Sequence, residues 1–132
     1  TVKANRSEFA RVSRLFVEAD PPDTPPSKQL EPYLRNMLPK LGFVIVDDRA
    51  DADAVLSHDA YVIITLHADA NDPPDRALYE FRLLLPDGRL LWKTTIRFVS
   101  KSDWAENNKS GAEKFGNRLI SDWKKARKNA RQ

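Results

Sequence analysis

Three consecutive residues, Ser57, His58 and Asp59, are of the types that form a nucleophilic triad. They lie in a segment that reads as a β-strand, where neighbouring side chains point to opposite faces. His58 therefore cannot face both of its neighbours, and we expect a strand with one incompletely buried histidine. His67, the other histidine, stands nine residues further on, which places it on the opposite face of a regular strand. The two histidines could share a metal only if a bulge lay between them.

Four aspartates, Asp47, Asp48, Asp51 and Asp53, are clustered in the sequence. Such carboxylates could ligate calcium, which needs several converging oxygens, a sharp glycine turn and a distal glutamate. This stretch has no glycine and no glutamate at that spacing. We interpret the cluster as side-chain caps of a turn, with adventitious cation binding as the alternative.

Residues needed for other chemistries are missing as well. The chain has no cysteine, which excludes disulfides, thiol catalysis and cysteine-ligated metals. Its four glycines are scattered, so no glycine-rich loop can cradle a phosphate. The sequence therefore predicts a protein that is not an enzyme and binds no cofactor or metal. A small-molecule carrier with an apolar pocket between helices and sheet is a minor alternative.

Basic residues are concentrated near the carboxyl end. The net charge of the 132 residues is +3, yet residues 101–132 hold nine Lys and Arg against four Asp and Glu. A basic helix can contact nucleic acid, anionic lipid or an acidic protein, and it can equally be a solvated face. We take Lys124, Lys125 and Arg127 as candidate contact residues. A nucleic-acid-associated domain is the alternative function, although few exposed aromatic residues are available for base stacking.

The hydrophobic pattern predicts one α+β domain with the element order β-α-β-β-β-β-α. We expect a mixed, mostly antiparallel sheet with both helices packed on one face, and parallel strands on either side of the first helix. Residues 1–11 should form an arm and residues 12–130 a single domain. No run is long and apolar enough for a membrane span. The expected strands are 12–18, 43–47, 54–68, 76–85 and 90–100, and the expected helices are 28–41 and 111–128.

Each expected helix has signals at its ends. Ser27 is placed to cap the first helix, Pro39 to bend its last turn, and Gly42 to take the left-handed position that follows. In the last helix, Ser110 with Glu113 fits a capping box. A weaker signal of the same kind at 103 and 106 leaves an earlier start near 103 as the alternative.

The sequence Asp87-Gly88 is a hairpin signal between two apolar strands. A two-residue turn there would put the apolar side chains of both strands on one face, in agreement with their alternation. The register that this turn predicts pairs 85 with 90, 83 with 92, 81 with 94 and 79 with 96.

Three features outside the expected core could contact a partner. Residues 21–26 include four prolines, which stiffen a polar loop, and we take Pro22 and Pro25 as candidate contact residues. Trp104 lies outside the apolar stripes that hold the other tryptophans, so it is a candidate anchor for a partner. An exposed strand edge is the third candidate, because it can add a strand from a partner.

The whole pattern resembles small periplasmic domains of bacterial envelope lipoproteins. It is carried by residues 30–46 (a helix, then Leu-Gly-Phe, then a strand), by Ala-Asp-Ala-Val-Leu at 52–56, and by Asp-Gly-Arg-Leu-Leu-Trp at 87–92. The resemblance covers about residues 12–128. The group includes the curli-secretion-channel lipoprotein, the penicillin-binding-protein activator lipoproteins, the lipopolysaccharide-assembly lipoprotein and the amino-terminal domain of the Tol-Pal translocation protein.

This resemblance implies a non-enzymatic adaptor or assembly module in the periplasm, acting through contacts with a protein partner of the cell envelope. Such proteins carry a lipid-bearing cysteine, which this sequence lacks. Since the chain begins at Thr1 without a methionine, we expect a processed or trimmed amino end, with a membrane tether upstream of Thr1. The resemblance transfers no specific functional residue.

Overall fold

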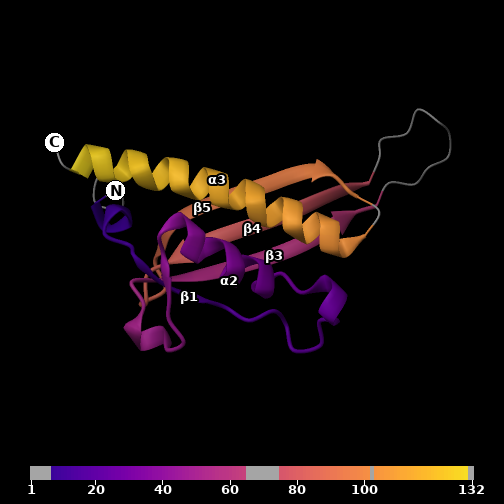
Figure 1. Cartoon of the computed structure of the whole chain (residues 1–132), viewed down its shortest axis with the longest axis horizontal. Helices are drawn as coiled ribbons and strands as arrows, with labels where there is room; N and C mark the ends of the chain where they lie inside the picture. The colour runs from indigo at the N-terminus through magenta and orange to yellow at the C-terminus, as the bar shows by residue number, and fades with distance from the viewer. Residues whose placement is uncertain (1–6, 65–74, 102, 131–132) are drawn as a thin grey trace.

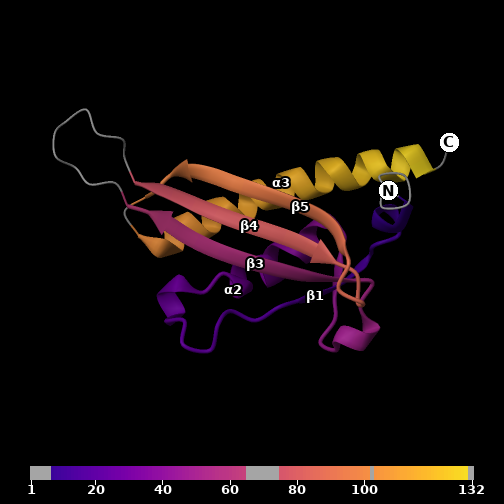
Figure 2. The same cartoon turned by 180° about the vertical axis from the view of Figure 1, so that it is seen from behind.

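The computed structural model describes residues 7–64, 75–101 and 103–130. A five-stranded sheet has the order β2-β1-β3-β4-β5. Helices α2 and α3 lie on one face of the sheet (Figure 1), and no described element covers the other face (Figure 2). The predicted α+β class, with both helices on one face, is confirmed. The elements are β1 (Arg14–Val17), α2 (Glu31–Met37), β2 (Val44–Ile45), β3 (Ala54–Ile63), β4 (Arg76–Leu84), β5 (Leu90–Val99) and α3 (Trp104–Ala130), with short 3₁₀ turns η1 (Pro26–Lys28), η2 (Leu38–Leu41) and η3 (Arg49–Asp51).

The sheet is mixed in the way that the sequence predicts. Strand β1 runs parallel to both β2 and β3, so the two strands that flank the first helix are parallel neighbours. Strands β3, β4 and β5 pair antiparallel over most of their length. Leu15 and Val17 of β1 are buried under the helices, and Phe16 on the opposite side is half-buried. Strand β3, which pairs parallel with β1 and antiparallel with β4, therefore joins the parallel part of the sheet to the antiparallel part.

The described part of β3 is shorter than the predicted strand 54–68. It ends at Ile63, Ile64 is not part of the strand, and residues 65–68 of the prediction, with His67, lie outside the described residues. The predicted alternation holds where it can be checked. Ala54 and Leu56 are fully buried on the helix side, while Tyr61 and Ile63 are exposed on the other side.

The hairpin differs from the prediction at its turn. Leu85 N–H donates to the carbonyl of Arg89, and Gly88 (φ +94°) takes the left-handed position, so the loop has three residues instead of two. A three-residue loop would by itself shift the pairing of β4 with β5 by one residue from the predicted register. A bulge beside Leu84 restores it, so that Leu83 faces Trp92 as predicted, whereas Leu84 and not Leu85 faces Leu90. The predicted inward position of Leu90 is wrong: its side chain is 49% exposed, and Leu91 is buried instead.

The predicted helix 28–41 is broken into three pieces. Residues 26–28 form η1, α2 spans Glu31–Met37, and η2 follows at Leu38–Leu41. Pro39 is in η2, because a proline lacks the N–H that a continuing α-helix would need. Gly42 (φ +104°) takes the left-handed position after η2, as predicted.

The predicted cap at Ser27 is wrong. The amino end of α2 is instead capped from a distance by the carboxylate of Asp20, which accepts the N–H groups of Leu30 and Glu31 at 3.0–3.1 Å. The residue preceding a helix can cap it only if its own side chain reaches the first turn. Here the proline loop ends in η1, so Ser27 is too far along the chain to do so.

The last helix begins earlier than 111. Asp103 accepts the N–H of Glu106 at 2.8 Å, so the weaker of the two predicted caps is the one used. The helix continues through two glycines that serve close packing. A Cβ on Gly111 would lie 3.0 Å from the Tyr79 ring, and a Cβ on Gly116 would lie 2.5 Å from the sulfur of Met37. The glycines let α3 approach both the sheet and α2.

The core extends into the segment expected to be an arm. Residues 7–10 are helical, and Phe9 is buried with its ring 6.0 Å from that of Trp92. Phe115 of α3 lies fully buried at the centre, 4.2 Å from the ring of Phe81. This stacked pair joins the long helix to the middle of the sheet.

Candidate partner-binding surface

The residues of the apparent triad are separated by the sheet. His58 lies on the helix side, where its side chain is 4% exposed and its Nε2 donates to the carbonyl of Glu18 at 2.8 Å. Asp59, on the uncovered side, pairs with Arg82 of β4. The expectation that His58 cannot face both neighbours is confirmed, and the imidazole serves to hold the chain that follows β1.

One of the clustered aspartates caps its own turn, as predicted, whereas another binds a distant strand. Asp48 accepts the N–H of Ala50 at 2.9 Å and begins η3. Asp53 accepts the N–H groups of Ser13 and Arg14 at 3.0 and 2.9 Å. Burial alone would raise the pKa of Asp53, but these hydrogen bonds outweigh it and lower that pKa below its ordinary value. Within the described ranges, no group of three or more His, Asp or Glu side chains is arranged to hold a metal ion.

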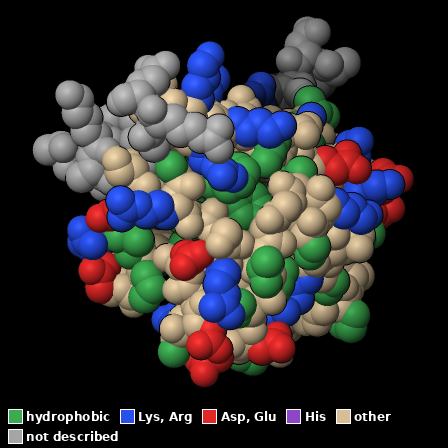
Figure 3. Space-filling model, turned by 60° about the vertical axis from the view of Figure 1, so that its left-hand side comes forward, with side chains coloured by type: hydrophobic (Ala, Val, Ile, Leu, Met, Phe, Trp, Pro, Cys, Tyr) green, Lys and Arg blue, Asp and Glu red, His purple; other side chains and the backbone are tan. Residues whose placement is uncertain are grey.

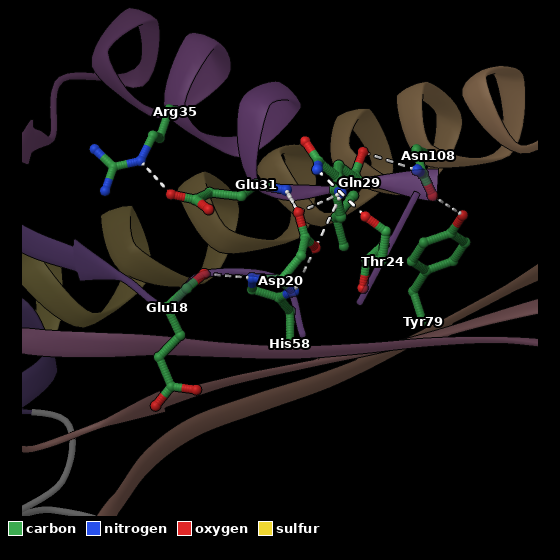
Figure 4. Close-up of polar contacts among 10 residues, drawn as sticks. Glu18, Asp20, Thr24, Gln29, Glu31, Arg35, His58, Tyr79 and Asn108 are labelled. Carbon is green, nitrogen blue, oxygen red and sulfur yellow. Dashed lines mark hydrogen bonds and ion pairs between the residues drawn. The ribbon is translucent and has the colours of Figure 1, made fainter. Parts of the chain in front are cut away.

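Pro22 and Pro25 are exposed on a loop whose two flanking segments are hydrogen-bonded to the rest of the fold. On one side, the Asp20 carboxylate binds the start of α2. On the other side, the carbonyl of Gln29 accepts a 3.0 Å hydrogen bond from Nδ2 of Asn108. Oδ1 of the same Asn108 accepts a 2.6 Å hydrogen bond from the Tyr79 hydroxyl (Figure 4). Hydrogen bonds therefore hold the chain on both sides of the proline loop, to α2 through Asp20 and to α3 through Gln29.

Asn108 is a residue that the sequence analysis missed. It is fully buried on the apolar side of α3, one turn before Ala112. A polar residue on an otherwise apolar stripe was the available signal, because a buried amide needs partners. Burial raises the pKa of the Tyr79 hydroxyl that binds it, so this hydroxyl stays a donor.

Trp104 lies half-buried at the start of α3, beside the end of the proline loop. The ammonium group of Lys28, at the end of η1, lies 5.6 Å from the centre of the indole ring. The structure thus brings Trp104 and the proline loop together, although the sequence placed them about eighty residues apart. Beside the ring is a depression of about 400 Å³, the Trp104 pocket, lined by Lys28, Val62, Ile64, Ser100, Lys101, Asp103, Trp104 and Asn107.

The uncovered face of the sheet has apolar side chains at the same end. Tyr61, Ile63 and Val99 are 49%, 50% and 57% exposed and form what we call the exposed apolar patch. Cross-strand register places Ile63 and Val99 on either side of Arg76. Because Val62 and Ile64 line the Trp104 pocket on the opposite side, apolar groups are accessible on both sides of the end of β3. We call the pocket and the patch together the docking end.

The basic candidates lie elsewhere. Lys124, Lys125 and Arg127 are exposed near the carboxyl end of α3, about 30 Å from Trp104 for twenty residues of helix. Arg127 lies 4.6 Å from the Trp123 ring, and Trp123 Nε1 donates to the carbonyl of Val12. Basic and acidic side chains are interspersed over this side of the molecule (Figure 3). The structure therefore separates the predicted contact residues into two groups at opposite ends of α3.

No helix in the described part of the chain is long and apolar enough to cross a membrane. No protein-family model matches the sequence, and no curated protein matches it. Among solved structures, the chain is similar to the crystal structure of a minor lipoprotein from Acinetobacter baumannii. The two share 19% sequence identity with a TM-score of 0.44, over 92% of this chain and 91% of that chain.

Proposed function

We propose that this chain is a non-enzymatic adaptor or assembly module of a periplasmic cell-envelope lipoprotein, which works by binding a protein partner at the docking end. The observation that carries the proposal is the position of apolar side chains on both sides of one end of the sheet. Tyr61, Ile63 and Val99 are about half exposed there, and the Trp104 pocket lies behind them. Exposed apolar groups gathered at one end of a sheet are a common mark of protein interaction sites.

The surroundings of Trp104 also favour a protein partner. Tryptophan is over-represented among residues that dominate binding energy, especially beside pockets that exclude water. Lys28 and Lys101 add charge at the border of this pocket, as in interfaces with an apolar centre and a polar rim. The proline loop leads into η1, whose Lys28 lines the pocket, and hydrogen bonds on both sides of this loop reduce the ordering needed on binding.

The reactive side chains have structural partners, which supports an adaptor without catalysis. His58 binds the carbonyl of Glu18, Asp20 caps α2, and Asp53 caps the start of β1. The periplasmic location and the membrane tether are proposed from the sequence pattern that resembles envelope lipoproteins.

Site-specific photo-crosslinking in cells of the native host tests the proposed surface. A photoreactive amino acid would replace Tyr61 or Trp104 in the full-length protein, and a matched variant would carry it at Lys125. We expect a discrete protein adduct from the first two positions and none from Lys125. Equal labelling at all three positions, or no protein adduct at any, would contradict the proposal. Recovery of the full-length protein in the cytosolic fraction would contradict the periplasmic location.

Exposed lysines on the last turns of α3 favour a second candidate, a nucleic-acid-associated domain. Binding that uses phosphate contacts weakens steeply with salt. Fluorescence anisotropy with single- and double-stranded oligonucleotides at about 50 mM salt, where screening is weak, would detect it. The double variant Lys124→Glu/Lys125→Glu should abolish such binding if this candidate is correct.

A further inference from the structure

We propose that the second half of β5, residues 95–99, is an open sheet edge that accepts an acidic, extended segment of a partner protein as an additional strand. This inference rests on the proposed adaptor function and names the chemistry of its partner. An edge strand can pair with a peptide through main-chain hydrogen bonds, and flanking side chains then decide which peptide fits.

The backbone of this segment faces outward at alternate residues. Among the described strands, β5 is the last one of the sheet, and only one of its sides is paired. Ser100 N–H donates to the carbonyl of Asp75 at the β4 side, whereas the carbonyl of Thr95 accepts from Arg118 outside the sheet. Because antiparallel strands alternate with period two, Arg97 and Val99 direct their backbone groups outward with Thr95.

The helix leaves this half of the strand accessible. In Figure 1, α3 crosses in front of the first part of β5, while the end of β5 lies at the border of the sheet. Figure 2 shows the same border from behind, again with no described element beside it. The side chains of Arg97 and Val99 are exposed there.

Charge selects the partner. Residues 90–101 contain no Asp or Glu, and Lys93, Arg97 and Lys101 are exposed along this segment. From α3, the ammonium of Lys114 lies 5.9 Å from the Phe98 ring, and Arg118 contacts Thr94 and Thr95. Basic groups thus line both sides of the edge, and an acidic strand would complement them. Val99 belongs to the exposed apolar patch, which favours a segment that alternates acidic and apolar residues.

The same charges disfavour a second copy of this chain. An antiparallel pair of β5 strands centred on residue 97 would place Arg97 opposite Arg97, and like charges directly opposite are destabilising. In the free protein, Nη1 of Arg118 donates to the Thr95 carbonyl at 2.7 Å and so covers one group of the edge. A partner N–H would replace this donor, which would free the guanidinium to pair with a carboxylate of the partner.

The test uses a fluorescent, end-capped octapeptide that alternates valine and glutamate, measured by anisotropy at about 50 and about 300 mM salt. A second peptide has the same charges but carries N-methyl groups on alternate amides, which removes its strand donors. A third replaces glutamate by lysine. We expect the first peptide to bind at least about tenfold more tightly than either other peptide. Equal binding of the N-methylated peptide would overturn strand addition, and equal binding of the lysine peptide would overturn the acidic preference.

Variants and amide NMR shifts locate the site. Arg97→Glu should weaken binding of the acidic peptide by at least about tenfold. Lys125→Glu makes the same charge change near the carboxyl end of α3, away from this edge, and should leave the binding unchanged. If Arg97→Glu lowers the thermal midpoint of unfolding, Arg97→Gln replaces it as the test variant.

Changes in amide NMR shifts show where the peptide binds. Changes confined to residues near 95–101 support the proposal, and changes confined to the carboxyl end of α3 overturn it. Two other outcomes would also overturn the proposal. One is an oligonucleotide that binds more tightly than the acidic peptide and loses this binding in Arg97→Glu. The other is a dimer of this chain that the peptide dissociates. If photo-crosslinking at Tyr61 traps a protein while no acidic peptide binds, the adaptor function stands and this inference fails.

Discussion

The Tyr79 hydroxyl donates a 2.6 Å hydrogen bond to Oδ1 of Asn108, and both residues are fully buried. Tyr79 belongs to the central part of the sheet and Asn108 to the first turns of α3. Since Nδ2 of Asn108 binds the carbonyl of Gln29, one amide joins sheet, helix and proline loop. The position of the loop beside Trp104 thus depends on a polar contact inside the core.

Removing this hydroxyl should destabilise the protein and loosen the loop. Tyr79→Phe leaves Oδ1 of Asn108 buried without its donor, which typically costs about 1–3 kcal/mol of the free energy of unfolding. Chemical denaturation measures the change, and hydrogen exchange should show faster exchange at residues 29–31. Tyr61→Phe is the matched control, because Tyr61 is exposed, and its effect should be within about 0.5 kcal/mol. Equal stability of the two variants would refute the role of this bond.

The two helical glycines should respond differently to alanine. A Cβ on Gly111 meets three atoms of the Tyr79 ring at 3.0–3.1 Å, and this ring is held by its hydrogen bond. Overpacking of this kind costs about 1–3 kcal/mol, which exceeds the roughly 1 kcal/mol that alanine contributes as a helix former.

At Gly116, the nearest atom is the sulfur of Met37, a flexible side chain that is half-buried and can move aside. We expect Gly111→Ala to lower the thermal midpoint and Gly116→Ala to change it much less. The opposite order would show that Tyr79 is free to shift.

Protonation of Asp53 should account for part of the folding stability that the protein loses at low pH. Its pKa is lowered in the folded state by hydrogen bonds from Ser13 and Arg14. A carboxyl with a lowered folded pKa contributes stability that is present above its ordinary pKa and is lost as the pH falls through the folded value. Asp53→Asn should therefore reduce stability at pH 7 and flatten its decline on acidification. Urea unfolding at a series of pH values measures both, and parallel curves for the two proteins would contradict the prediction.

The centre of the core should be the most sensitive to truncation. Phe115 is fully buried and stacks on Phe81, so Phe115→Ala should cost about 3–5 kcal/mol. Trp92 is half-buried and bonded to Asp122, so Trp92→Ala should cost less than Phe115→Ala. Lys124→Ala, an exposed change on the same helix as Phe115, should be nearly neutral. Denaturant midpoints rank the three variants, and a loss at Lys124 comparable to that at Phe115 would contradict the packing described.

Local patterns in the sequence determined the elements and most of their faces. Alternation along β3 and β4 predicted which side is buried, because side chains in a strand alternate regardless of what covers them. Asp48 and Gly42 could be interpreted from their immediate neighbours, since a cap or a left-handed turn involves only a few residues. The parallel arrangement of β1 and β2 followed from the helix that connects them.

Only the tertiary structure decided the contacts made across long separations in the chain. Asp53 binding the start of β1, His58 binding the carbonyl of Glu18, and Asn108 joining Tyr79 to Gln29 each depend on neighbours far away in the sequence. The docking end is of the same kind, since it combines the ends of β3 and β5 with Lys28 and Trp104. Periodicity shows which side of an element is buried, but the packing of elements against each other selects which polar groups meet, and one sequence pattern is compatible with many such arrangements.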